Sequence, residues 1–120
     1  HEYGITIISL DEDYRHKIEP GAASYRDRLK ALRALHDKGM RTWVSIEPYP
    51  TPNLIKQDIN DLLLSVSFAN KIIFGKTNYN KDITAYTKHK YFYNELANKV
   101  ISFCKNRGIE YHIKNGTMVM

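Results

Sequence analysis

The sequence predicts an α/β fold with a parallel sheet, forming an arc of a (β/α) barrel. Apolar, β-prone runs alternate with segments of helical periodicity along the chain. Strand starts recur about every 30–40 residues, the size of a right-handed βαβ unit. No GxGxxG motif follows any strand and no P-loop motif occurs, which argues against both types of nucleotide site. Because four strands cannot close a barrel, we expect two open edges and a bare inner face.

Four short runs rich in β-branched and aromatic residues are expected to be strands. The first is apolar on both faces, which is typical of a buried parallel strand. The second runs directly into Glu47 and a loop with three prolines, and the fourth precedes an expected flexible tail at 114–120. The expected strands cover residues 3–11, 40–47, 71–75 and 109–113.

Segments with apolar residues at helical spacing separate these strands. Asp11 can cap a short helical turn. Ser24 opens the first long helix, with Asp27 three residues later in a capping-box-like arrangement, and Gly39 follows as a left-handed cap. A polar loop is expected at 76–88. The expected helices cover residues 12–19, 24–38, 51–53 to 68–70, and 90–107.

Composition indicates one globular domain and leaves its partner open. The chain has 120 residues, of which 42% are hydrophobic and 26% charged. Its net charge of +5 permits a polyanionic partner, but the charges are scattered rather than clustered. No run approaches the roughly 18 apolar residues of a membrane span, and the start does not resemble a signal peptide. Because the chain begins at His1, without a methionine and in mid-strand, we expect a fragment of a longer protein.

The single cysteine predicts neither a disulfide nor a metal site within this chain. A lone Cys104 excludes an internal disulfide and fits a reducing cytoplasm. It lies on the apolar stripe of the helix expected at 90–107, where a small buried hydrophobe is the usual role of a free cysteine. The histidines lie on separate expected elements, without the spacing of metal ligands.

Polar side chains follow three of the expected strands at their carboxyl ends. In parallel barrels, functional groups are found at this end, in the loops that lead to the helices. We therefore expect one rim site to which three strands contribute. The residues are Ser9 and Asp11, Ser45 and Glu47, and Lys76, Thr77 and Asn78.

The loop after the second strand is expected to hold an acid beside a ring. Glu47 precedes a proline, which favours an extended backbone, and the prolines restrict the loop. Tyr49 is then presented as a fixed aromatic surface, and the pair suits a ribose or a positively charged group. The alternative is that Glu47 forms an ion pair with a lysine, such as Lys71 or Lys76, across neighbouring strand ends.

The residues from 8 to 53, ISLDEDYRHKIEPGAASYRDRLKALRALHDKGMRTWVSIEPYPTPN, resemble the radical S-adenosylmethionine superfamily, in the branch similar to spore photolyase. The matching features are a strand that ends in Ser9, the Glu-Pro-Gly motif at 19–21, a helix with Arg28 near its start, and a following strand. The closing run at 109–113 resembles the last strand of that group. The resemblance spans about residues 3–113.

The resemblance implies a fold and a chemistry for the longer protein. The fold is a partial (β/α)6 TIM-type barrel, of which this chain is the C-terminal half. The chemistry is reductive cleavage of S-adenosylmethionine by a [4Fe–4S] cluster to a 5′-deoxyadenosyl radical, which the cofactors supply and the protein orients. The family holds its cluster with a CxxxCxxC motif, which this sequence lacks. We therefore expect an inactive part that binds neither S-adenosylmethionine nor the cluster by itself. Its expected partners are the missing N-terminal half-barrel and a substrate that could be a nucleic acid or another macromolecule.

Five residues take cofactor-binding roles from the resemblance. Ser9 lies near the S-adenosylmethionine in the family, and the alternative is that its hydroxyl satisfies local backbone. Arg28 is expected to hold the carboxylate of S-adenosylmethionine or to pair with Glu19. The others are Ser45 and Glu47, where the fifth strand of the family approaches the adenosyl group, and Asn78 after its sixth strand.

A second hypothesis is a basic α/β module that binds nucleic acid without catalysis. Tyrosines interleave with lysines between residues 79 and 93 and could stack on bases. A CxxxCxxC motif encoded upstream would favour the enzyme, whereas salt-dependent binding of single-stranded nucleic acid would favour the module.

Self-association is expected of the chain in isolation. The bare inner face should be covered by a second copy or by a swapped element. The residues expected on that face are Ile5, Ile7, Trp43 and Ile72.

Overall fold

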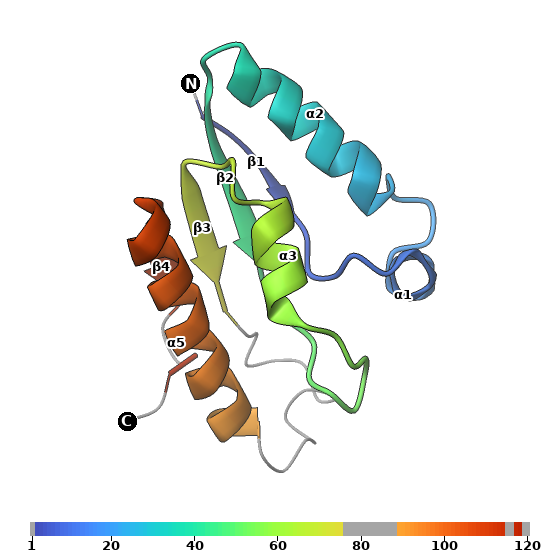
Figure 1. Ribbon diagram of the computed structural model, residues 1–120. Helices are drawn as coiled ribbons and strands as arrows, with labels where there is room; N and C mark the ends of the chain where they lie inside the picture. Colours follow the sequence, from blue (N-terminus) through green and yellow to red (C-terminus); the bar gives the residue numbers. More distant parts are fainter. Residues whose placement is uncertain (1, 76–88, 115–116, 119–120) are drawn as a thin grey trace.

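The computed structural model describes residues 2–75, 89–114 and 117–118. Four parallel strands form one sheet in the order β1-β2-β3-β4, with helices between them along the chain (Figure 1). This confirms the predicted α/β fold with a parallel sheet. The strands are β1 (Glu2–Thr6), β2 (Arg41–Ile46), β3 (Lys71–Phe74) and β4 (Glu110–Ile113).

The capping residues expected from the sequence delimit the first two helices. The Asp11 carboxylate accepts the Tyr14 N–H at 2.9 Å, and the Ser24 hydroxyl accepts the Asp27 N–H at 3.0 Å. Gly39 has a φ of 89°, as a left-handed cap requires. The described helices are α1 (Glu12–Ile18), α2 (Tyr25–Asp37), α3 (Ile59–Ser65) and α5 (His89–Arg107).

The prediction that a helix begins at 51–53 is wrong. Helix α3 begins at Ile59, where the Asp58 carboxylate accepts the Asn60 N–H at 2.9 Å as the N-cap. The preceding segment forms a turn, closed by the Leu54 N–H on the Thr51 carbonyl at 2.9 Å, and crosses the carboxyl end of the sheet. A helix of seven residues is marginal in isolation, so tertiary packing must stabilise α3.

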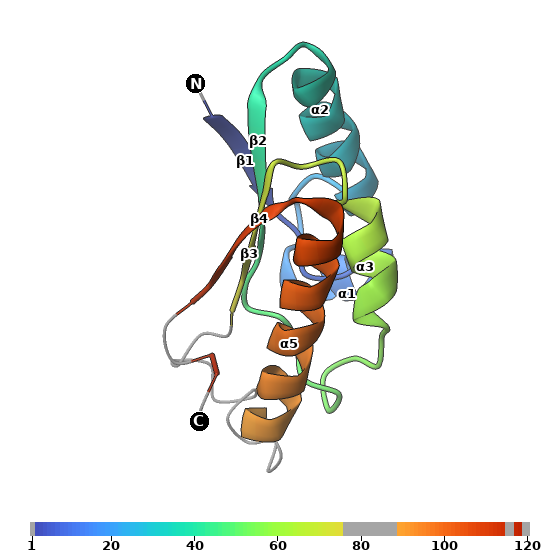
Figure 2. The same cartoon turned by 60° about the vertical axis from the view of Figure 1, so that its left-hand side comes forward.

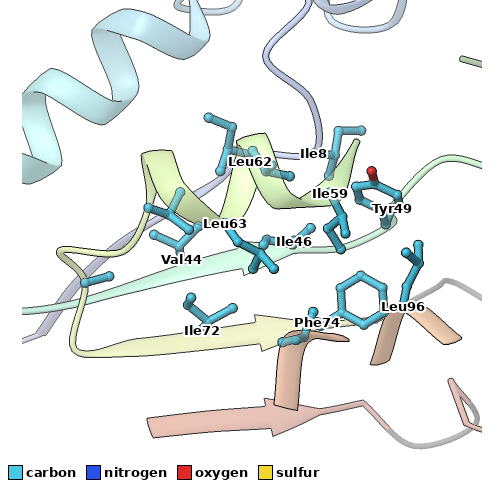
Figure 3. Close-up of a cluster of buried hydrophobic side chains, with 14 of the residues drawn as sticks. Ile8, Val44, Ile46, Tyr49, Ile59, Leu62, Leu63, Ile72, Phe74 and Leu96 are labelled. Carbon is cyan, nitrogen blue, oxygen red and sulfur yellow. The ribbon is translucent and has the colours of Figure 1, made fainter. Parts of the chain in front are cut away.

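All described helices lie on one face of the sheet, as Figure 2 shows. On that face Val44, Ile46, Ile72 and Phe74 are fully buried. Leu63 of α3 packs into the same cluster, which is drawn in Figure 3. Burial of such side chains contributes about 1.5–3 kcal/mol each, so this layer dominates the stability of the fold.

The opposite face of the sheet carries no helix in the described part of the chain. The strand register aligns Gly4, Trp43 and Lys71 in one row across the strands. The next row contains the buried Val44 on the covered face, and side chains alternate along a strand, so the first row lies on the bare face. Ile5 and Ile72 instead pair with Val44 on the covered face, so their assignment to the inner face is wrong. Ile7 is also wrong, since it is fully buried in the core. Runs that are apolar at consecutive positions hold no information about which face is covered.

An ion-pair network crosses the amino end of the bare face. Arg41 lies 2.7 Å from Glu2 on β1 and 3.2 Å from Glu110 on β4. Lys71 lies 3.4 Å from the same Glu110 carboxylate. Exposed pairs of this kind contribute less than about 1 kcal/mol each. Their effect is to give the bare face a polar amino end that joins all four strands.

Two further findings concern the helices. No described helix has both the length and the apolar character that crossing a bilayer requires. The prediction that Cys104 is a buried hydrophobe is confirmed, because the residue is fully buried on α5. Burial away from water raises the pKa of the Cys104 thiol to about 11.

We predict that Cys104 resists alkylation in the folded protein. The thiol is inaccessible, and its raised pKa keeps it protonated at neutral pH, whereas the thiolate is the reactive form. Iodoacetamide at pH 8 should modify less than about a tenth of the native protein in the time that modifies all of it in 6 M urea, followed by intact mass. Equal rates in the two conditions would contradict the buried position of this helix face.

Candidate functional site

The carboxyl ends of the strands form a continuous rim, because strand-like hydrogen bonds continue past the strand ends. The Ile7 N–H bonds to the Ser45 carbonyl at 3.0 Å, and the Gly75 N–H bonds to the Ile46 carbonyl at 3.3 Å. The Lys114 N–H bonds to the Phe74 carbonyl at 2.9 Å. The ladder therefore places residues that follow all four strands at one end of the sheet, where barrel sites are found.

A pocket of about 280 Å³ lies at this rim, between α1 and the loop that follows β2. Its walls are mostly apolar, and two carboxylates, Glu19 and Glu47, contribute to them from different elements. Small-molecule sites are usually apolar pockets that contain a few polar groups. The lining residues are Thr6, Ile8, Tyr14, Ile18, Glu19, Glu47, Pro48, Pro50 and Leu54.

Glu47 forms an ion pair with Lys114 at the rim. The Glu47 Oε1 atom lies 3.7 Å from the Lys114 Nζ atom, and both side chains are partly exposed. The alternative that Glu47 pairs with a lysine at a strand end is therefore confirmed, but the lysine is Lys114. Lys71 instead pairs with Glu110 at the other end of the sheet, and Lys76 lies outside the described residues. Because the two charged atoms are 3.7 Å apart and partly exposed, this ion pair is weak, and either side chain can bind another charged group instead.

Gly75 allows this pair to lie close against β3. A Cβ at Gly75 would be 2.8 Å from the Cβ of Lys114 and 2.9 Å from Oε2 of Glu47. Any side chain there would therefore push the two charged residues away from the sheet. The glycine at the end of β3 thus fixes where the Glu47–Lys114 pair lies.

The second carboxylate, Glu19, is held by Arg28 at the start of α2. The Arg28 guanidinium lies 3.3 Å from Glu19 and donates to the Thr6 carbonyl at 3.0 Å. It also lies 5.1 Å from the centroid of the Tyr25 ring. The predicted pairing of Arg28 with Glu19 is confirmed. Arg28 therefore joins α1, α2 and the end of β1, and so positions one wall of the pocket.

Ser9 and Gln57 join the end of β1 to the loop before α3. The Ser9 hydroxyl donates to the Gln57 Oε1 atom at 2.6 Å and accepts the Asp11 N–H at 3.0 Å. The Gln57 amide donates to the Ile8 carbonyl at 2.9 Å. Ser9 is fully buried, so its hydroxyl satisfies local groups in the present structure. We call these three contacts the Ser9–Gln57 clamp.

The remaining predicted site residues have different positions. Ser45 is half-buried on the bare face, in register with Thr6 and Ile73. Asn78, with Lys76 and Thr77, lies outside the described residues.

The expectation that Tyr49 offers an aromatic surface beside Glu47 is wrong. Its ring is buried 5.8 Å from the centroid of Phe74, and burial raises its pKa to about 12. The Glu47–Pro48 peptide bond that precedes it is cis. The Tyr49 N–H bonds to the Gly75 carbonyl at 3.2 Å, which turns the ring into the core.

Sequence reasoning missed Tyr14, Gln57 and Lys114 as parts of this rim. Lys114 follows β4 at its carboxyl end, so the rule that selected Glu47 would also have selected it. The sequence instead assigns 114–120 to a tail, whereas Thr117 is fully buried and its N–H bonds to the Lys114 carbonyl at 3.1 Å. No sequence pattern identifies Gln57, because its hydrogen-bond partners Ser9 and Ile8 lie 48 and 49 residues earlier in the chain.

No comparison with known proteins assigns this rim a role. Family models, curated proteins and solved structures give no match to this chain. Within the described residues, no three His, Cys, Asp or Glu side chains come together to hold a metal ion. The functional argument therefore depends on the geometry of the rim.

We predict that the Ser9–Gln57 clamp contributes to stability through coupled hydrogen bonds. Ser9→Ala should lower the free energy of unfolding by about 0.5–1.5 kcal/mol, because the half-buried amide oxygen of Gln57 loses its donor. The double variant with Gln57→Leu should cost less than the sum of the single variants, since neither polar group is then left unpaired. Urea unfolding measures the four free energies.

The matched control is Ser67→Ala, which removes an exposed hydroxyl that donates to the Leu64 carbonyl at 2.8 Å. This change should stay within about 0.5 kcal/mol of the parent. Additive costs for Ser9 and Gln57 would show that the two side chains do not act together.

Proposed function

We propose that this chain forms the S-adenosylmethionine-binding part of a radical S-adenosylmethionine enzyme. The sheet is then an arc of a (β/α)6 partial barrel, and the bare face lines its interior. The order β1-β2-β3-β4, with all described helices on one face, supports this arrangement. The observation that carries the functional proposal is the Glu47–Lys114 pair, of which Glu47 also lines the rim pocket.

The donor set at the rim fits the amino-acid end of S-adenosylmethionine. That end carries an ammonium and a carboxylate on one carbon, and Glu47 and Lys114 offer the opposite charges 3.7 Å apart. The ammonium would bind Glu47 and the carboxylate would bind Lys114, so the ligand replaces one ion pair by two. When bound, S-adenosylmethionine supplies the 5′-carbon on which the chemistry of the family depends.

The pocket beside Glu47 suits an uncharged, partly apolar portion of the ligand. Its volume of about 280 Å³ lies at the lower limit of the range of about 300–1,000 Å³ for small-molecule sites. Glu19 in its wall can accept hydrogen bonds from ribose hydroxyls while it remains paired with Arg28. The rim thus offers acceptors for hydroxyls and a zwitterion receptor at its mouth.

The residues present do not fit the [4Fe–4S] cluster. Such a cluster requires thiolate ligands, and the only cysteine, Cys104, is fully buried on α5 with a pKa raised to about 11. The cysteine ligands would have to come from outside these 120 residues. Within this proposal the chain binds and orients S-adenosylmethionine and contributes no cluster ligand.

The predicted site residues take two kinds of role in this proposal. Glu47, with Lys114, would contact the ligand directly, and Ser45 lies on the same face of β2. Ser9 and Arg28 are positioning residues, because their polar groups already bind Gln57 and Glu19 and hold the walls of the pocket. Asn78 stays a prediction.

Isothermal titration calorimetry with S-adenosylmethionine tests the proposal. The resemblance alone predicts no bound cofactor for this part, but the Glu47–Lys114 pair is already formed within it, so we expect binding by the parent chain. We expect a loss of affinity of about tenfold or more in Glu47→Gln and in Lys114→Gln, since each change removes one charge-assisted contact. S-adenosylhomocysteine has the same amino-acid end and should show the same dependence on both residues.

Glu95→Gln is the matched control, because Glu95 pairs with a lysine on α5 at 4.0 Å and lies outside the rim pocket. It should bind S-adenosylmethionine like the parent. The proposal is rejected if the parent chain does not bind, or if the two rim variants bind as tightly as the control.

A further inference from the structure

Ile18, the last residue of α1, gives the rim pocket an exposed apolar wall. Of the large apolar residues that the described part of the chain leaves exposed, only Ile18 lines this pocket, and it is 40% exposed. Leu54 and Pro50 add apolar wall from the loop after β2. Because the removal of apolar surface from water is favourable, a ligand with an apolar group would gain free energy by covering Ile18.

The size and the charges of the pocket suit an uncharged side chain. Its volume of about 280 Å³ lies just below the range of about 300–1,000 Å³ for sites of drug-sized ligands, so an aliphatic side chain can enter it. Both carboxylates in its wall are already paired, Glu19 with Arg28 at 3.3 Å and Glu47 with Lys114 at 3.7 Å. The part of a ligand that enters the pocket should therefore carry no charge.

Glu47 connects this apolar pocket to a pair of opposite charges. The same carboxylate lines the pocket and lies 3.7 Å from the Lys114 ammonium. An anion, a cation and an apolar hollow thus adjoin one another at the rim. A ligand that matches all three carries an ammonium, a carboxylate and an apolar chain on neighbouring atoms, and an α-amino acid has all three on one carbon.

We propose that the rim binds free α-amino acids with an apolar side chain, such as leucine. The ammonium binds Glu47, the carboxylate binds Lys114, and the side chain covers Ile18 in the pocket. The inference rests on the proposed role of the Glu47–Lys114 pair as a receptor for an amino-acid group, but it requires no adenosyl group. The pocket adds selection by the side chain, which the ion pair alone does not provide.

Compounds that lack one group of leucine test the three contacts separately. Isopentylamine lacks the carboxylate, isocaproate lacks the ammonium, and glycine lacks the side chain. Calorimetry on the full chain should show saturable binding of leucine. Each of the other three compounds should bind about tenfold more weakly or worse, because each loses one contact. The proposal is overturned if leucine does not bind, or if glycine binds as tightly as leucine.

The two enantiomers of leucine provide a test that needs no variant. Three different contacts to the groups of one carbon distinguish its two mirror-image forms, whereas two contacts do not. The affinities of L-leucine and D-leucine should therefore differ by about fivefold or more in calorimetry. Equal affinities would show that the charged groups and the side chain do not bind at the same time, and would contradict the proposal.

Ile18→Ala tests the apolar wall, and Leu64→Ala is its matched control. Ile18→Ala should weaken the binding of leucine about threefold or more, because the side chain of the ligand loses an apolar contact. Leu64 is 54% exposed on α3 and does not line the pocket, so its variant should bind leucine like the parent. Circular dichroism confirms the fold of both variants. Equal affinity in folded Ile18→Ala and Leu64→Ala would overturn the proposed place of the side chain.

Competition separates this inference from the proposed function. Leucine should lower the apparent affinity of the chain for S-adenosylmethionine, because both ligands need Glu47 and Lys114. Leucine binding without S-adenosylmethionine binding would reject the proposed function and support this inference. S-adenosylmethionine binding that leucine does not weaken would reject this inference and leave the proposed function intact.

Discussion

The burial of one sheet face and not the other is the constraint on which the whole structure depends. Parallel sheets are normally covered on both faces, and here the described helices cover only one. The buried layer consists of Val44, Ile46, Ile72 and Phe74. Helix α3 has only seven residues, so it is stable because it packs against this layer. The other face must then be stable against water or against a partner. Its ion pairs, hydroxyl groups and single indole ring satisfy that requirement without a second apolar layer.

The rim exists because all four strands are parallel, so that the residues after each strand lie at the same end of the sheet. Side chains at alternate positions point to the bare face, which places Ser45 of β2 there, and Glu47 follows this strand directly. Gly75 leaves room for Lys114 to approach Glu47 across the neighbouring strand. The loops are held by longer contacts, such as that between Ser9 and Gln57, whose hydroxyl and amide lie 2.6 Å apart. The geometry of the pocket is therefore a property of the whole layer.

The sequence predicts what local rules govern and misses what depends on partners distant in the chain. Strand order, parallel pairing and the caps at Asp11, Ser24 and Gly39 follow from periodicity and turn chemistry. The start of α3 was misplaced, because Leu54 and Ile55 have helical spacing but their N–H groups bond to the Thr51 carbonyl in a turn. The helix begins only after its Asp58 cap. The exposure of Tyr49 was wrong for a similar reason: its backbone bond to Gly75 directs the ring inward. Glu47 was found by its place after a strand, whereas its partner Lys114 was missed because the sequence assigns 114–120 to a tail.

The two ends of the bare face differ in how many ion pairs their charged side chains form. At the amino end, Arg41 and Lys71 share Glu110, so charges on three strands satisfy one another across the sheet. At the carboxyl end, the partly exposed side chains of Glu47 and Lys114 form an ion pair with 3.7 Å between their charged atoms, and Glu47 also lines the rim pocket. A ligand that enters at the amino end would have to break a network, whereas a ligand at the carboxyl end exchanges one loose contact. Trp43 lies between these ends, on the strand that Glu47 follows. The carboxyl end is therefore the end of the bare face at which a charged ligand would displace the fewest existing contacts.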